Sequence, residues 1–167
     1  LLWRLHLHGV NVGNRWEVLA DRWTPVATAG NYAFNDVHAV IAFVGAGRGG
    51  AADAVLDAQR AAMDGAGDNV DFTREVGSPV ARAIKACGDG DYGQTVELLR
   101  PIRSYAHRYG GSHAQRDLID LTLIEAAARA GQRNLAAALR AGRADRRHEF
   151  PAVRPASRSA VKLAATA

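Results

Sequence analysis

Cysteine is almost absent from this chain of 167 residues: Cys87 is the only one, so an internal disulfide is impossible. Its sequence neighbours offer nothing that would activate a thiol, and we expect a small buried helix residue there. No apolar run approaches the ~20 residues that span a bilayer. These absences argue against a membrane protein and favour a reducing compartment, so we expect a cytoplasmic location.

Lysine is scarce too, since Lys85 and Lys162 are the only lysines among 21 basic residues. The net charge of +4 is uneven: residues 1–139 hold 14 basic and 15 acidic residues, and residues 140–167 hold 7 and 2. No aromatic residues alternate with the later arginines, which argues against a nucleic-acid partner. Prolines, serine and small residues predict a disordered basic tail over 149–167.

Strand signals are nearly missing, whereas apolar residues recur at helical spacing along most of the chain. Trp16, Leu19, Ala20 and Trp23 stand at positions i, i+3, i+4 and i+7, which puts them on one face of a helix. The strongest helical pattern covers 113–131, where two adjoining apolar stripes indicate a central position. The sequence therefore predicts an all-α fold.

Four glycines mark a repeat. Gly9, Gly49, Gly90 and Gly131 stand 40, 41 and 41 residues apart, and each lies between two helical segments. Such spacing predicts a tetratricopeptide-like α-solenoid of about four antiparallel helix hairpins over residues 1–148. The expected pairs are 1–8 with 14–24, 32–46 with 50–63, 72–87 with 91–108, and 113–130 with 133–145.

Three irregularities should interrupt these helices. The segment 64–71 is rich in Gly, Asp and Asn and predicts a loop. Gly77, Ser78 and Pro79 predict a kink, and Pro101 should break or bend the helix that contains it.

A dense polar stretch, "GGSHAQRD", occupies residues 110–117. Ser112 followed by Gln115 predicts a capping box at the start of a helix, and the two preceding glycines can end the helix before it. His113, Arg116 and Asp117 remain to be explained. A histidine four residues from an aspartate is how general bases are oriented, but it is also an ordinary pair on a helix.

A second polar stretch, "FNDVHA", contains Asn35, Asp36 and His38. His38 borders an apolar stripe, which is typical of a partly buried core histidine. A sharper hypothesis is that His38 and His113 meet on one inner surface, where Asp36 and Asp117 would help them hold a metal or act as acid and base.

Three long strings, "LLWRLHLHGVNVGNRWEVLADRW", "AFNDVHAVIAFVGAGR" and "YGGSHAQRDLIDLTLIEAA", resemble the C-terminal part of the tetratricopeptide repeat protein 38 family. The resemblance extends to about Phe150 and includes the spacing between the strings. It implies a tetratricopeptide-like fold and a longer parent protein, of which this chain is a fragment. It implies no established biochemical activity and no catalytic residues.

Three hypotheses follow, and the residues favour a non-enzymatic protein without deciding the question of catalysis. The first is a scaffold that binds a protein or peptide partner in a concave groove, without a cofactor. The second is a metal-binding protein or hydrolase-like enzyme that uses the two histidines and two aspartates. The third is a structural module in which the polar residues only tie hairpins together. The candidates for the groove are Asn35, Asp36, His38, His113, Gln115, Arg116 and Asp117.

Overall fold

The computed structural model describes the backbone of residues 1–149 and the side chains of 1–108 and 110–145, and this part contains helices but no strand. The all-α prediction is therefore confirmed there. The predicted tail begins at the last residue of the final helix, and its remainder, 150–167, lies outside the described residues. The elements in chain order are α1 (Leu2–Leu7), α2 (Arg15–Trp23), α3 (Ala33–Gly45), α4 (Gly49–Met63), α5 (Asp68–Phe72), the π-helical turn η1 (Thr73–Gly77), α6 (Ser78–Gly88), α7 (Tyr92–Ile102), the 3₁₀ turn η2 (Ala106–Tyr109), α8 (His113–Arg129) and α9 (Arg133–Glu149).

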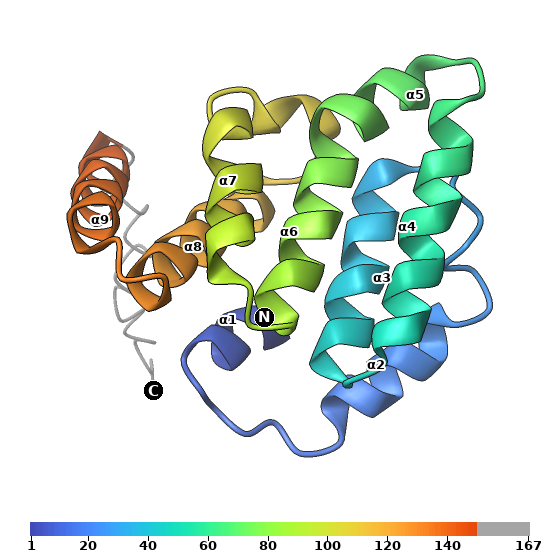
Figure 1. Cartoon of the computed structure of the whole chain (residues 1–167), viewed down its shortest axis with the longest axis horizontal. Helices are drawn as coiled ribbons and strands as arrows, with labels where there is room; N and C mark the ends of the chain where they lie inside the picture. The colour runs from blue at the N-terminus through green and yellow to red at the C-terminus, as the bar shows by residue number, and fades with distance from the viewer. Residues whose placement is uncertain (150–167) are drawn as a thin grey trace, which may run out of the picture.

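Three of the four predicted pairs are found, and the pairing of 1–8 with 14–24 was wrong, because α1 packs mainly on α8 and α2 packs on α3. Helix α4 packs on α3, α7 on α6, and α9 on α8, while α6 also packs on α3 and α7 on α8. Figure 1 shows α7, α6, α3 and α4 side by side, with α9 at the edge of the molecule beyond α8. Each helix thus buries its apolar face against its neighbours, as the helical periodicity requires.

The loop predicted over 64–71 is confirmed only for its first residues, because the last four belong to a helix. Helix α5 begins at Asp68 and carries two aspartates in its first turn, where the helix dipole favours negative charge. It continues into η1 and then α6, which has Pro79 in its first turn. The π turn lies directly before Pro79, whose nitrogen cannot donate to the carbonyl four residues earlier.

The predicted break at Pro101 is confirmed, and the helix expected over 91–108 was therefore too long. Helix α7 stops at Ile102, since the proline ring removes one backbone donor and crowds the preceding turn. After η2 the chain reverses through Gly110 and Gly111, with φ angles of 97° and 80° that side chains rarely adopt. A Cβ atom at Gly111 would lie 2.5 Å from the ring of Phe34, so the turn also depends on close packing.

The N-terminal helix α1 lies against α8 and α3, far from both in sequence. Trp3 is 1% exposed and belongs to the same apolar core as Val37, Ile84 and Leu123. Its indole Nε1 donates to the hydroxyl of Thr122 on α8 at 2.9 Å. Helix α1 therefore covers the face on which the first helices of the later hairpins meet.

Candidate functional site

Asp117 connects three helices. Its carboxylate accepts two bonds from Arg143 of α9, at 2.6 and 2.8 Å, and a third from Arg4 of α1 at 2.8 Å. Burial alone would raise the pKa of this carboxyl, but the bonds from Arg143 and Arg4 outweigh it and hold the pKa below the usual range. A carboxylate engaged in this way stabilises the packing of α1 and α9 on α8.

The rest of the stretch 110–117 begins the helix. Ser112 Oγ accepts from the amide of Gln115 at 3.3 Å, and Gln115 Oε1 accepts from the amide of Ser112 at 2.8 Å, so the predicted capping box is confirmed. Arg116 donates to the carbonyl of Gly111. One of its guanidinium nitrogens also lies 3.3 Å from Nδ1 of the exposed His113.

The second polar stretch lies on the first two turns of α3. Asn35 is exposed, whereas Asp36 is buried and accepts from Nε2 of Gln59 on α4 at 3.3 Å. Burial raises the pKa of Asp36, and the bond from Gln59 offsets only part of that rise. His38 is half-buried, with Nδ1 2.8 Å from the carbonyl of Phe34 and its ring 4.3 Å from that of Phe34. The expectation of a satisfied, partly buried histidine agrees with these contacts.

The polar stretches around His38 and His113 are joined by the aromatic ring of Phe34. The ring of Phe34 lies tilted against that of His38 and packs against Gly111. Asp36 contacts α4, and Asp117 contacts α1 and α9. Within residues 1–108 and 110–145, no three His, Cys, Asp or Glu side chains are grouped so that they could hold a metal ion. The four histidine and aspartate candidates are thus not gathered at one metal position.

Cys87 lines a cavity of about 230 Å³ with His6, Tyr92 and Arg129. Burial raises the pKa of its thiol to about 11, and the nearby Arg129 lowers it less than burial raises it. The pKa of His6 is lowered, first by burial and then by the charge of Arg129. A protonated thiol beside a neutral imidazole is a poor nucleophile at neutral pH, in line with the structural role expected for Cys87.

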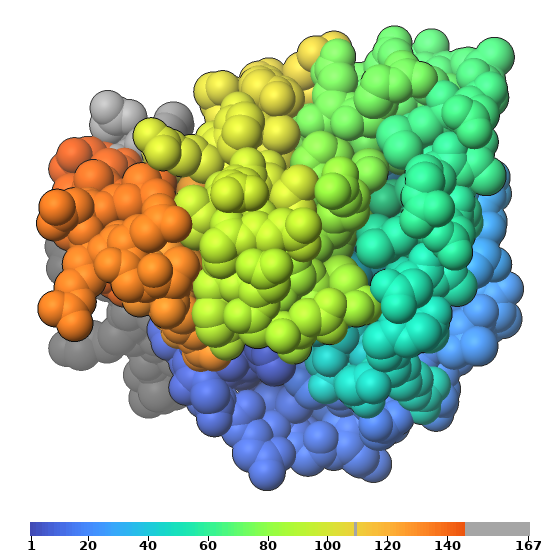
Figure 2. Space-filling model, viewed as in Figure 1, coloured from blue at the N-terminus to red at the C-terminus, as the bar shows by residue number. Residues whose placement is uncertain are grey.

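A larger cavity, of about 520 Å³, lies between α7 and α9, and we call it the α7–α9 groove. Figure 2 shows the two helices meeting on the left of the molecule. This groove was not predicted from the sequence, although its residues stand at i, i+3 and i+4 on both walls. The lining residues are Arg100, Arg103 and Ser104 on the α7 side and Leu135, Ala138 and Leu139 on α9.

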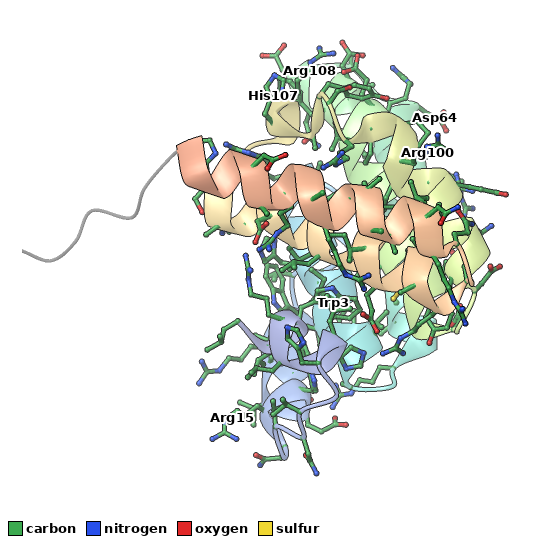
Figure 3. All side chains as sticks on the ribbon, turned by 90° about the vertical axis from the view of Figure 1, so that its left-hand side faces the viewer. Trp3, Arg15, Asp64, Arg100, His107 and Arg108 are labelled. Atoms are coloured by element: carbon green, nitrogen blue, oxygen red, sulfur yellow. The ribbon has the colours of Figure 1, made fainter. Side chains whose placement is uncertain are left out.

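The α7–α9 groove combines positive charge with an apolar wall. Arg100 is exposed, lies beside α9 in Figure 3, and forms no ion pair with any side chain that the structure describes. Arg103 donates from Nε to Asp120 of α8 at 2.6 Å, while its Nη2 is buried without a hydrogen-bond partner among the described residues. No carboxylate is among the residues that line the groove.

The chain was compared with models of protein families and with the solved structures, and neither search gave a significant match. The similarity to the tetratricopeptide repeat protein 38 family therefore stays a prediction from the sequence. None of the described helices is long and apolar enough to cross a membrane.

Proposed function

We propose that the protein is a tetratricopeptide-like helical-repeat scaffold that binds a segment of a partner protein. The antiparallel pairs α3–α4, α6–α7 and α8–α9 support this proposal, since each pair packs on the next as helix hairpins do in a solenoid. The similarity to the C-terminal part of the tetratricopeptide repeat protein 38 family points the same way.

The α7–α9 groove is the observation that carries the proposed function. A concave inner face was expected to bind the partner, but α1 packs against α8 and α3, with Trp3 in the core and Arg4 bonded to α8. The α7–α9 groove is on the side of the second helices and has a volume typical of binding sites, which range over about 300–1,000 Å³. We therefore place the partner in this groove.

The contacts of the candidate catalytic residues favour a non-enzymatic role. Asp36 and Asp117 are used in packing α4, α1 and α9 against their neighbours. His38 is bonded to a backbone carbonyl. These contacts are the ones expected of a structural module, so binding is assigned to a different surface.

Site-specific photo-crosslinking tests the proposed function. A photoreactive phenylalanine analogue replaces Ala138, an exposed residue of the α7–α9 groove, and in a second protein replaces Ala61, an exposed residue of α4. We expect discrete adducts in cell extract from position 138 that do not form at position 61. Each protein identified is then purified and titrated against the full chain.

A blocking variant completes this test. Ala138→Trp fills the α7–α9 groove, whereas Ala137→Trp adds the same bulk at an exposed position of α9 that does not line it. Ala138→Trp should abolish binding of the purified partner, and Ala137→Trp should preserve it. Equal adducts at positions 138 and 61, or equal binding by the two tryptophan variants, would refute a scaffold that works through this groove.

A further inference from the structure

We infer that the α7–α9 groove receives an acidic amphipathic helix of a partner protein. The apolar face of that helix would lie on α9, and its carboxylates would pair with Arg100 and Arg103. The inference builds on the proposed function and names the chemistry of the partner.

The shape of the groove supports a helical occupant. On α9, Leu135, Ala138 and Leu139 stand at i, i+3 and i+4, so one helical turn faces the groove. Arg100, Arg103 and Ser104 have the same spacing on the α7 side, where Arg103 and Ser104 lie just beyond the end of the helix. An amphipathic helix presents apolar side chains at the same spacing and can therefore interdigitate with one wall while its flank meets the other.

Small side chains on α9 leave the room for this occupant. Ala138 is exposed, whereas Leu135 and Leu139 are half-buried and buried. The alanine between two leucines makes a hollow with apolar edges, and the cavity of about 520 Å³ extends from it toward α7. Burial of apolar side chains in such a hollow contributes roughly 25 cal/mol per Å² of apolar surface.

Charge complementarity selects an acidic helix. Arg100 and Arg103 are the charged residues of the groove, and Arg103 also donates from Nε to Asp120 of α8. Arg140 of α9 is also exposed, but it does not line the groove. A carboxylate placed between the two guanidinium groups of the groove would gain charge-assisted hydrogen bonds, and a basic helix would be repelled.

Nucleic acid and membranes fit the groove less well. Its lining has no aromatic side chain on which a base could stack. The apolar residues are recessed between two helices, whereas a lipid surface needs an apolar face that protrudes. Both remain outcomes that the experiment separates.

The probe is a fluorescent synthetic helix of about 16 residues, long enough for four turns. It carries Leu at i, i+3, i+4 and i+7 and Glu on both flanks. One matched peptide has Lys in place of every Glu, and another has the same composition in scrambled order. With the full chain we expect the acidic peptide to bind at least about tenfold more tightly than either control peptide. Its affinity should fall as the salt concentration rises from about 0.05 to 0.3 M.

Charge reversal locates the binding. Arg100→Glu should weaken the acidic peptide about tenfold and improve binding of the lysine peptide. Arg140→Glu, which makes the same change on α9 outside the groove, should alter the affinity by less than about twofold. Ala138→Trp should block the acidic peptide and Ala137→Trp should not. Circular dichroism and thermal unfolding of each variant show whether it keeps the native fold.

Several results would overturn the inference. One is equal affinity for the acidic, lysine and scrambled peptides, and another is an equal effect of Arg100→Glu and Arg140→Glu. A third is that anionic vesicles or single-stranded RNA bind more tightly than the acidic peptide and that Arg100→Glu abolishes this binding. If Ala138→Trp blocks binding of a crosslinked partner but Arg100→Glu leaves its affinity unchanged, the scaffold function stands and the inference of an acidic helix is wrong. Absence of any groove-dependent partner refutes both.

Discussion

Asp36 and Asp117 have opposite pKa shifts because their partners differ. Asp36 is buried and accepts one bond from a neutral amide, so burial dominates and its pKa rises. Asp117 is 24% exposed and accepts three bonds from two guanidinium groups, so its pKa falls although burial opposes this. The charge of Asp117 therefore stabilises the fold at neutral pH, whereas the charge of Asp36 opposes it.

The first prediction concerns Asp36. Asp36→Asn should raise the free energy of unfolding at pH 7 by about 1 kcal/mol. The new amide can donate to Oε1 of Gln59, which is buried without a hydrogen-bond partner among the described residues, while its oxygen still accepts from Nε2. Urea unfolding of the two proteins measures this difference.

The pH dependence of that difference follows from the raised pKa. The folded protein binds a proton at Asp36 at a pH where the unfolded chain is still ionised, so wild-type stability rises relative to the variant as the pH falls through the folded pKa. The advantage of Asp36→Asn should shrink toward the unfolded pKa of about 3.9. Asp57→Asn, at an exposed residue of α4, serves as the control. A variant less stable than wild type at pH 7 would contradict the argument.

The sequence predicted those parts of the site that depend on near neighbours. Ser112 and Gln115 are three residues apart, and their capping box depends only on local geometry. Arg4 and Arg143 reach Asp117 from 113 and 26 residues away, so no local pattern shows them. Arg100 lines a groove that exists only after α7 and α9 have folded onto α8.

At the scale of elements, helix type and helix pairing were predictable, and exact boundaries were not. Apolar periodicity is a local property, and it identifies the pairs α3–α4, α6–α7 and α8–α9 but not the partner of α1. The start of α5 at Asp68 depends on the favourable charge of a first turn, which the composition of the segment 64–71 concealed. The π turn η1 joins α5 to α6 without a break, so the predicted loop and helix boundaries did not match the structure there.

The second prediction concerns the packing of η1 on α3. A Cβ atom at Gly77 would lie 2.6 Å from Cβ of Ala33, which is too close for two rigid atoms. Gly77→Ala should therefore destabilise the protein by roughly 1–3 kcal/mol, although alanine is the better helix former. The midpoint of thermal unfolding measures the effect.

Gly142 provides a matched control on α9. A Cβ atom there would meet nothing within 4 Å, so Gly142→Ala should stabilise the protein by about 0.5–1 kcal/mol through helix propensity alone. If both substitutions shift the midpoint in the same direction, close packing at Gly77 is not what limits the η1–α3 contact.

At the scale of the molecule, α1 packs on helices that are distant from it in sequence. The bond between Trp3 and Thr122 joins positions 119 residues apart and holds α1 against α8. The periodicity of single helices predicts which face of each is buried but not which helix buries it. The position of α1 on α8 was for that reason not predictable from the sequence.

The last prediction tests the role of α1 in the whole fold. Trp3→Ala should reduce the free energy of unfolding by roughly 3–5 kcal/mol, since it removes a side chain that is 1% exposed at the junction of α1 and α8. Trp3→Phe keeps most of the apolar surface and loses the bond to Thr122, so it should cost less than Trp3→Ala. Leu1→Ala, at a residue 89% exposed, should have almost no effect. Hydrogen exchange should accelerate in α1 and in α8 for Trp3→Ala, because α8 loses the helix that covers it. If exchange changes in α1 alone, α1 is an independent appendage and the inner face is available to a partner after all.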